Sequence, residues 1–374
     1  MAEKFSLKDH LFNAKTVGQL ADEYTAGVPG FDGARFQDEA LSGFAERELM
    51  ARMEWMADCL EKQLASDFPT LANQLEAAMA APLDTSLTDD DFGHFIHALP
   101  GILAVRHGIE AHRDRALDLL YEATKRFSME FYIRGFLNRW PDETLARLAD
   151  WSLDDNYHVR RLVSEGTRPK LPWAKAISLD FEQALPLLER LHSDATRYVT
   201  RSVANHLNDI AKTEPDRVVE VLASWACAGQ QDAKELAWMT RHALRTLVKQ
   251  GHGGALELLG YRHDIAVKAK MNIAPQVRIG DTLLIACELE ADQNLPVMVD
   301  YRLRFARPGG KAAEKVFKLK VTELSERKPS KLQKNHRLKA DATTFKWHPG
   351  AHEIVLQVNG MDVDRVAFEV LPSA

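Results

Sequence analysis

The stretch DNYHVRRLVSE, residues 155–165, decides the fold, because its pattern of residue types returns 40 positions later. Val159 and Arg161 fall opposite Val199 and Arg201 in the second copy. A period of about 40 residues is typical of HEAT-like arrays, in which each unit is a pair of helices. One pair cannot cover its own apolar face, so neighbouring pairs must stack. The repeat therefore predicts an α-helical solenoid.

A third copy follows after another 40 positions, with Arg241 and Arg245 in the places of Arg201 and Asn205. In stacked helix pairs the second helices line a concave surface, so we expect these polar positions to face one groove. Prolines are expected at junctions between helices, since proline begins or ends a helix more readily than it continues one. They stand at positions 141, 169, 172, 186 and 215.

The pattern changes after residue 261, where short strand-like segments replace the helical periodicity. These segments are residues 282–289, 298–305, 315–321, 353–358 and 363–370, separated by turn residues at 308–310, 349–350 and 359–360. Several short strands at this spacing indicate an antiparallel β-sandwich of immunoglobulin-like type. We therefore expect a HEAT-like repeat domain over residues 1–261 and an immunoglobulin-like sandwich over residues 262–374.

The composition is that of an ordinary soluble protein, with 374 residues, 45% hydrophobic residues and a net charge of -6. No apolar run approaches the roughly 18 residues that a membrane helix needs. The start of the chain lacks the apolar core of a signal peptide. Three widely separated cysteines form neither a disulfide framework nor a metal motif. We therefore expect a cytoplasmic protein with no membrane segment and no metal site.

Charge is distributed unevenly along the chain. Residues 1–100 carry 7 Lys+Arg against 18 Asp+Glu, whereas residues 262–374 carry 19 against 14. Residues 302–339 alone hold 13 basic residues against three glutamates. Such a segment can hold a nucleic-acid backbone in a salt-dependent way. Its lysines can equally belong to a solvated sheet face with a protected edge.

The segment 163–173 carries the first candidate for chemistry. Glu165 is expected on the inner face of a repeat helix, four residues past Arg161, and a loop with one glycine and two prolines then leads to Trp173. A carboxylate beside a fixed aromatic ring suits stabilisation of a developing sugar cation. The alternative is an inter-helix turn in which Glu165 forms a structural ion pair with Arg161.

Two further segments carry polar residues in unusual places. Glu130 is flanked by apolar residues, so it needs either a function or a structural ion pair with a nearby arginine. Arg201, Asn205 and Asp209 recur at a spacing of four residues, which places them on one helix face. That face could hold phosphate and bring Asp209 near a reaction. It could also be a hydrogen-bonded ladder between repeats.

These segments, in this order on a repeat array, resemble the DNA alkylation-repair glycosylases of the AlkC/AlkD superfamily. Residues 164–173 and 203–209 are similar to that family's signatures, and residues 315–320 are similar to its pattern in the sandwich. The likeness is closer to the AlkC branch, which carries an immunoglobulin-like domain, and it spans nearly the whole chain.

The resemblance implies a monofunctional glycosylase of base excision repair that releases cationic alkylated bases, 3-methyladenine and 3-methylcytosine, without flipping them out of the duplex. Its partner would be double-stranded DNA containing alkylated bases, its cofactor none, and its state a monomer. By position, Glu130, Glu165 and Trp173 would be the catalytic residues. Residues that contact DNA would be Arg161, Arg168, Arg201, Asn205, Asp209, Lys315, Lys318 and Lys320, the lysines forming a clamp.

Two other functions remain open at this stage. A non-catalytic HEAT scaffold would bind protein partners, which the acidic first hundred residues favour. A DNA-structure-binding protein would bind tightly but release no base. Retention of Glu130, Glu165 and Trp173 favours an active enzyme.

Overall fold

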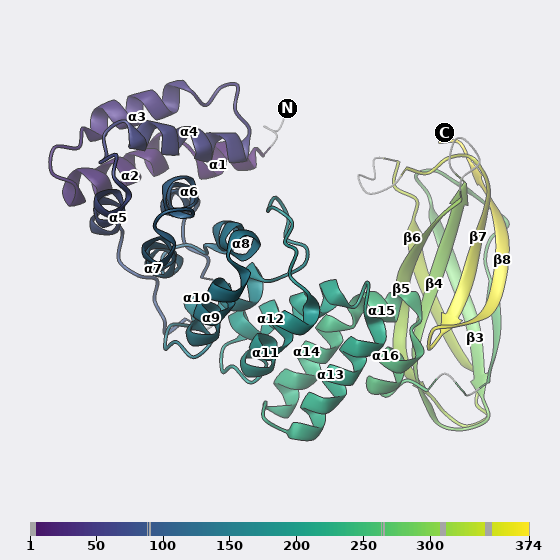
Figure 1. Cartoon of the computed structure of the whole chain (residues 1–374). Coiled ribbons are helices and arrows are strands. Elements are labelled where there is room, and N and C mark those ends of the chain that lie inside the picture. The colour runs from purple at the N-terminus through teal and green to yellow at the C-terminus, as the bar shows by residue number, and fades with distance from the viewer. Residues whose placement is uncertain are drawn as a thin grey trace. The chain divides into compact units, whose positions relative to one another are not determined.

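The computed structural model describes residues 5–87, 89, 91–262, 264, 266–306, 312–340 and 346–373. The chain forms two compact units, residues 1–210 with 229–239 and residues 211–228 with 240–374. The first unit is helical, and the second holds the described strands (Figure 1).

The first unit is a series of short helices joined by turns and by two longer loops, between Ala77 and Phe95 and between Gly166 and Phe181. The helices are α1 (Leu7–Leu11), α2 (Ala14–Gly27), α3 (Gly33–Ser42), α4 (Leu49–Glu61), α5 (Phe68–Ala77), the 3₁₀ turn η1 (Phe95–Ala98), α6 (Leu99–Leu103), the π turn η2 (Ala104–Gly108), α7 (Arg113–Thr124), α8 (Glu130–Arg139), α9 (Pro141–Trp151), α10 (Tyr157–Gly166), α11 (Phe181–Leu191) and α12 (Arg197–Ile210). The next, α14 (Ala233–Ala243), is divided between the two units.

The repeat predicted from the sequence is confirmed for its first two copies. Helix α10 begins at Tyr157 and α12 at Arg197, an offset of 40 residues, and α10 packs against α8, α11 and α12. The third copy is out of step, because α14 begins at Ala233, 36 residues after Arg197. Arg241 therefore lies in the last turn of α14, whereas Arg201 lies in the second turn of α12. The repeat is one of helix pairs, and its length varies by one helical turn.

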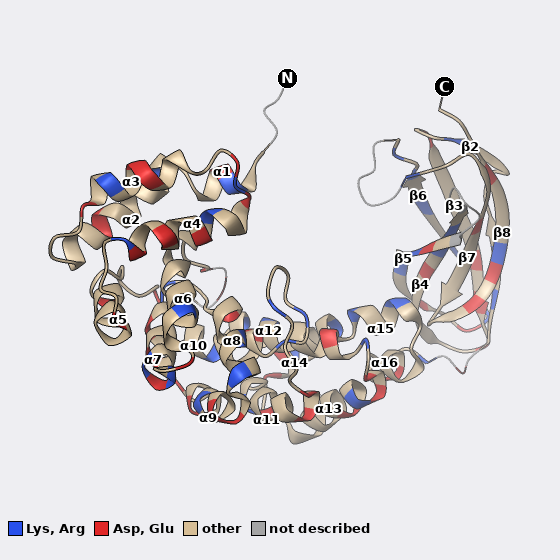
Figure 2. Cartoon of the chain, turned by 45° about the horizontal axis from the view of Figure 1, so that its top comes forward, with Lys and Arg blue, Asp and Glu red and all other residues tan. Residues whose placement is uncertain are grey.

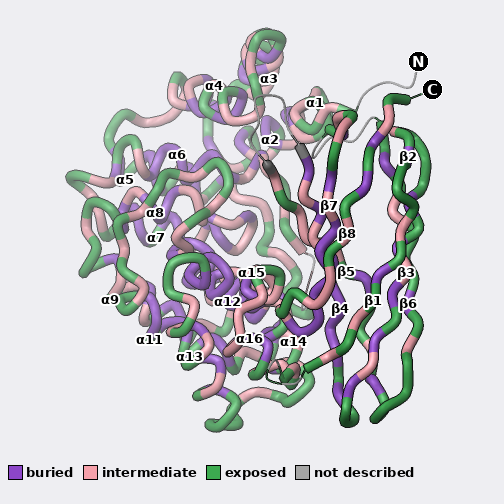
Figure 3. The backbone as a smooth tube through the Cα atoms, turned by 90° about the vertical axis from the view of Figure 1, so that its right-hand side faces the viewer, coloured by how far each residue is buried: buried purple, intermediate pink, exposed green. Residues whose placement is uncertain are grey.

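Local sequence explains where α10 begins and which face it buries. The side chain of Asn156 caps the helix by accepting a hydrogen bond from the backbone N–H of His158 at 2.9 Å. Val159, Leu162 and Val163 are fully buried, as are their counterparts in α12. Figure 3 shows α12 buried along most of its length. These two helices therefore form the core on which the polar residues of the repeats are fixed.

The prolines mostly lie where the sequence predicts. Pro141 and Pro215 begin helices α9 and α13, and residues 169 and 172 lie in the loop after α10. Pro186 does not lie at a junction, because it stands inside α11. Its ring is exposed to solvent, so water can satisfy the carbonyl group that its missing N–H would have bonded.

The second unit contains three helices and eight strands among the described residues. The helices are α13 (Pro215–Ala228), α15 (Arg245–Gln250) and α16 (Gly253–Leu258). One sheet has the order β1 (Val267–Asn272), β3 (Thr282–Ala291), β6 (Ser330–Arg337). The other has the order β2 (Gln276–Arg278), β8 (Met361–Leu371), β7 (Gly350–Val358), β4 (Leu295–Ala306), β5 (Ala312–Leu324). Pairing is antiparallel except between β2 and β8.

The predicted sandwich is confirmed, and each of the five expected strands is present. Every second residue of β4 from Leu295 to Phe305 belongs to the core between the sheets. Strands β1, β2 and β6 were not expected from the sequence. Strand β6 has Leu332 as its sole buried apolar residue, and β2 is three residues long, so neither carries a visible alternation.

The last helix ends at Leu258 and the first strand begins at Val267, so the expected domain boundary between residues 261 and 262 lies in the segment that joins them. The compact units divide differently, because α13, α15 and α16 group with the sandwich. The expected turn at Asn359-Gly360 is confirmed, with φ of 48° and 80°. The expected turn at 308–310 lies outside the described residues.

A close backbone approach holds the helical part of the second unit to the turn between β7 and β8. A side-chain carbon added at Gly360 would lie 2.8 Å from the Cα of Gly251, and one added at Gly251 would lie 2.8 Å from the Gly360 carbonyl oxygen. Both residues also have positive φ, 80° and 75°.

We therefore expect Gly360→Ala to destabilise the second unit by about 2 kcal/mol and so to lower its midpoint of thermal unfolding. Gly280→Ala is the matched control, since Gly280 has a φ of 104° but no atom within 4 Å of an added carbon. Thermal unfolding followed by circular dichroism compares the two. Equal losses would mean that backbone conformation alone matters and that the close approach does not.

Candidate active site

Glu130 and Glu165 are brought together by a single guanidinium group. Glu130 is the first residue of α8, and Arg161 and Glu165 lie one turn apart in α10. Arg161 pairs through Nη1 with Oε2 of Glu130 and through Nη2 with Oε2 of Glu165, the latter at 3.6 Å. The hydroxyl of Ser128 also donates to Glu130 Oε2 at 2.7 Å. The ion pairs considered from the sequence as a structural alternative are thus present. Whether the two carboxylates also border a pocket depends on the residues around them.

Glu165 is buried, with an exposure of 4%, and both of its carboxylate oxygens are engaged. Arg168 pairs with Oε1, and the hydroxyl of Ser202 in α12 donates to Oε2 at 2.6 Å. Burial by itself would raise the pKa of Glu165. The positive charges of Arg161 and Arg168, with the Ser202 hydrogen bond, outweigh burial and hold that pKa below its usual value. Glu165 is therefore ionised in the folded protein at neutral pH.

Arg168 extends the ion-pair cluster to Asp209. Its Nη2 lies 2.8 Å from Oδ2 of Asp209, and its Nε donates to the same oxygen at 3.0 Å. Burial would lower the pKa of Arg168, but the carboxylates of Glu165 and Asp209 raise it. Asp209 is buried and does not line the pocket described next. It fixes the partner of Glu165 and does not itself face that pocket.

Glu130, Arg161, Glu165 and Arg168 line a pocket of about 340 Å³ in the first unit. The rest of its wall is largely aromatic, formed by Phe92, Phe95, Phe127, Phe131, Trp173 and Tyr198. The Tyr198 ring lies 4.8 Å from the Arg161 guanidinium carbon, an attractive cation–π contact. The carboxylates therefore border a pocket of suitable size for a small organic group.

Trp173 stands at the edge of this pocket in an unusual backbone conformation. Its φ is 63°, in the left-handed region, and its exposure is 63%. Bulky residues seldom adopt this conformation, and where they do the surrounding structure must hold them there. An exposed ring maintained at such a cost is expected at a binding site.

Two buried histidines lie close to the pocket wall. His158 packs 5.7 Å from the ring of Tyr198, and Nδ1 of His206 lies 3.1 Å from the carbonyl oxygen of Ser164. Burial lowers the pKa of each to about 4. Both imidazoles are therefore neutral at pH 7, so neither supplies a proton to a leaving group.

The other two expected DNA-contacting residues of α12, Arg201 and Asn205, lie outside the pocket. Arg201 forms an ion pair with Asp89, from the segment before η1, and its guanidinium carbon lies 5.8 Å from the Tyr198 ring. Asn205 lies one turn further along α12 and is half-buried. Neither residue lines the pocket. The structure groups them with the pocket on one helix but does not place them in it.

The three expected lysines lie on β5, in the second unit (blue in Figure 2). Lys318 and Lys320 are exposed, and Lys318 pairs with Asp300 at 3.2 Å. Lys315 is half-buried, with its ammonium group 5.7 Å from the ring of Phe317. Lys320 also lines an open groove of about 890 Å³ with Lys270 and Lys331. The basic surface of the sandwich therefore includes lysines of three strands.

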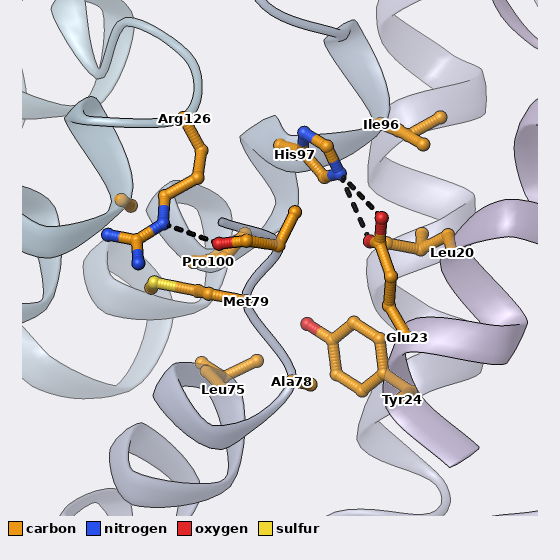
Figure 4. Close-up of a pocket in the computed structure, with 12 residues that line it drawn as sticks. Leu20, Glu23, Tyr24, Leu75, Ala78, Met79, Ile96, His97, Pro100 and Arg126 are labelled. Carbon is orange, nitrogen blue, oxygen red and sulfur yellow. Dashed lines mark hydrogen bonds and ion pairs between the residues drawn. The ribbon is translucent and has the colours of Figure 1, made fainter. Parts of the chain in front are cut away.

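A second hollow in the first unit is structural. It is lined by residues of α2, α5, η1, α6 and α7, including the Glu23–His97 pair at 3.0 Å (Figure 4). Arg126 borders it and donates through Nε to the carbonyl oxygen of Ala80 at 2.8 Å. Its volume of about 10 Å³ holds no more than one water molecule. It therefore cannot accept a ligand.

Sequence reasoning found the charged residues of the pocket and Trp173, but it missed the other aromatic residues of the wall and the role of Arg168 as a bridge. Phe92 and Phe95 come from the segment before α6, and Tyr198 is the second residue of α12. Nothing in the spacing of these residues shows that they meet. Among the described helices, none is long and apolar enough to cross a membrane.

Comparison with known proteins identifies the class. Residues 125–247 match the family described as DNA alkylation repair enzyme, and residues 267–372 match the C-terminal Ig-like domain of the YhaZ family. Over 96% of its length the chain is 32% identical to the uncharacterized protein YhaZ of Bacillus subtilis, of which it covers 98%. The chain belongs to the DNA alkylation repair enzyme family, in the branch with a C-terminal immunoglobulin-like domain.

A solved structure extends this assignment to the fold. The Pseudomonas fluorescens alkylpurine DNA glycosylase AlkC, bound to DNA containing an abasic site analog, is 33% identical to the chain and superposes with a TM-score of 0.85. The match covers 98% of this chain and 100% of that protein. The chain thus has the AlkC-like arrangement of helical repeats followed by a sandwich.

The ion-pair cluster predicts how stability responds to acid. A carboxyl whose pKa is depressed by folding stabilises the protein above its unfolded pKa, and that contribution is lost as pH falls through the folded pKa. Arg168→Met removes one charge that depresses the pKa of Glu165 and leaves Asp209 with one partner fewer. We expect about 3 kcal/mol less stability at pH 7 and acid unfolding at a higher pH.

Acid titration monitored by circular dichroism measures this shift. Arg139→Met is the matched control, since Arg139 pairs with Glu110 at 2.9 Å on the exposed surface. That variant should unfold at nearly the pH of the parent protein. The electrostatic account would be wrong if the two variants unfolded at the same pH.

Proposed function

We propose that the chain is a DNA glycosylase that hydrolyses the N-glycosidic bond of cationic alkylated bases, 3-methyladenine and 3-methylcytosine among them. The observation that carries the proposal is the pair Glu130 and Glu165, held on one guanidinium at an aromatic pocket. Its similarity to an alkylpurine DNA glycosylase supports the same conclusion. The protein would act as a monomer on double-stranded DNA, in the cytoplasm and without a cofactor.

The chemistry of the substrate fits the groups present. Alkylation of a ring nitrogen makes the base positively charged, so it departs with the glycosidic electron pair as a neutral molecule. The sugar becomes an oxocarbenium-like cation, which water then attacks while losing a proton. The enzyme must stabilise a cation and orient water, but it need not protonate the base. Neutral His158 and His206 are compatible with that requirement.

The two carboxylates would divide this work. Both oxygens of Glu165 are held by Arg161, Arg168 and Ser202, so this group supplies a fixed negative charge. Glu130 is held through Oε2, and among the described residues no protein hydrogen bond ends on its Oε1. Glu130 would therefore orient the attacking water and accept its proton, while Glu165 stabilises the sugar cation.

Trp173 would pack on the deoxyribose or on the charged base, where its ring adds a cation–π contribution. Its exposure, and the 53% exposure of Phe92 on the same pocket, leave two aromatic surfaces accessible from solvent. A lesion that remains within the helix could meet such a surface without the cost of full extrusion. We therefore propose excision without base flipping.

DNA would be held by cationic side chains of both parts of the chain. Arg161, Arg168 and Arg201 would contact the backbone near the lesion, assisted by Asn205, and Asp209 would act indirectly by holding Arg168. Lys315, Lys318 and Lys320 would extend the contact to the sandwich as a clamp. In this proposal residues 1–261 form the glycosylase domain and residues 262–374 the clamp domain.

The catalytic assignment predicts that Glu130→Gln and Glu165→Gln each lower single-turnover release of 3-methyladenine from methylated duplex DNA by about 10²- to 10³-fold. Binding to DNA that contains an abasic analogue should persist, because the substitutions keep shape and remove only charge. Glu110→Gln, at an exposed ion pair, is the control and should release base at the parental rate.

Chromatography of the released bases identifies the substrate and measures the rate. Normal release by both pocket variants would refute the assignment. Tight DNA binding by the parent protein without release of any alkylated base would indicate a DNA-structure-binding protein instead.

The clamp predicts a change in salt dependence. Replacing Lys315, Lys318 and Lys320 by alanine should weaken DNA binding and reduce the slope of log K against log salt concentration by about two to three. Substitution is preferable to truncation near residue 262, because α13, α15 and α16 belong to the same compact unit as the sandwich. Alanine at Lys8, Lys62 and Lys125, each paired to a surface glutamate, is the control. An unchanged slope in the β5 variant would exclude the clamp.

A further inference from the structure

Among the described residues, Arg134 is the largest fully buried side chain, with an exposure of 1%, and its hydrogen bonds follow one pattern. Its guanidinium donates to four main-chain carbonyl oxygens, those of Gly166 at 3.2 Å, Arg168 at 2.7 Å, Pro169 at 3.4 Å and Lys175 at 2.5 Å. A buried arginine directed wholly at backbone acceptors organises a segment of chain, because each bond fixes the position of a carbonyl group.

The four carbonyls lie at the end of α10 and in the loop after it. Gly166 is the last residue of α10, so Arg134 places a positive charge at the negative end of that helix. The other three acceptors lie in residues 168–175, the segment that contains both prolines and Trp173. Arg134 itself lies in α8, one turn after Glu130. A single residue thus connects the helix of Glu130, the helix of Glu165 and the loop of Trp173.

Beyond Arg168, whose side chain pairs with Glu165 and Asp209, few contacts define the shape of this loop. The backbone hydrogen bonds within it are Arg168 N–H to Glu165 at 3.4 Å and Ala174 N–H to Leu171 at 3.2 Å. Asn138, one turn after Arg134, donates to the Ala176 carbonyl oxygen at 2.9 Å. The left-handed conformation of Trp173 costs about 1–3 kcal/mol and persists only where neighbouring contacts impose it. Beyond residue 169, the side-chain hydrogen bonds to this loop among the described residues come from α8.

We propose that Arg134 is a positioning residue that holds residues 167–176 in place, so that Trp173 stands at the pocket in its strained conformation. The effect of Arg134 on catalysis rests on the function proposed above, whereas its anchoring of the loop does not. Lysine cannot replace it, because one ammonium group cannot span four carbonyls that lie up to nine residues apart in sequence.

The first measurement is amide hydrogen exchange of the free protein, which requires no substrate. Arg134→Lys should increase exchange about fivefold or more in residues 167–176 and leave α12 and the sandwich unchanged. Arg139→Lys, on the exposed face of α8, should change neither. Asn138→Ala is a second variant at an exposed position, which folds more readily, and should loosen residues 174–178.

The second measurement is a double-mutant cycle with Trp173→Ala in the base-release assay. In the parent background Arg134→Lys should lower kcat about tenfold and change KM less than about twofold, because the ring is misplaced after DNA has bound. In the Trp173→Ala background the same change should cost less than about twofold.

The outcomes are separable. Unchanged exchange in residues 167–176 in both Arg134→Lys and Asn138→Ala would overturn the anchoring proposal. Equal costs of Arg134→Lys with and without Trp173 would show that Arg134 does not act through that ring, which also overturns it. If the parent protein releases no base, the proposed function fails, and the exchange measurement still decides whether Arg134 anchors the loop.

Discussion

The site depends on the two ion pairs that the guanidinium of Arg161 forms with Glu130 and Glu165. Two carboxylates held close together repel each other, and a cation between them offsets that repulsion. Arg161 lies between Glu130 and Glu165 and pairs with both of them. In the proposed reaction, negative charge would then already be in place when positive charge develops on the sugar, and little reorganisation would be needed at that moment.

The repeat explains how residues so far apart in sequence reach one guanidinium. Helices α8, α10 and α12 belong to successive helix pairs of the repeat. They contribute Glu130, Arg161 with Glu165, and Ser202, respectively. The same stacking that buries Val159 and Val203 fixes these positions. Core packing and site geometry therefore have one cause, and loosening of the stack would disturb both.

The sequence predicts those parts of the structure that follow a period. The 40-residue offset and the strand alternation indicate the repeat and the sandwich, and a carboxylate near an arginine on a helix face indicates the pocket. Other parts have no periodic signal. The ring of Phe92 arrives from a loop, and Arg168 reaches Asp209 across 41 positions. The shift of α14 by one turn, and the polar strand β6, follow from packing against neighbours that the local sequence does not specify.

The charge states of the pocket bear on the proposed selectivity. His158 and His206 are neutral and Glu165 is ionised, so none of these three groups offers a proton to a leaving base, and Glu165 would stabilise a sugar cation in the proposed reaction. An undamaged adenine or cytosine leaves poorly without protonation, whereas a base already charged by alkylation does not need it. Discrimination would then reside largely in the lesion's own charge and less in the fit of a deep pocket. An open, aromatic-walled site with two carboxylates on one guanidinium would be sufficient for the proposed reaction, and a loop that holds one exposed ring in a strained conformation would add the alignment that electrostatics alone cannot provide.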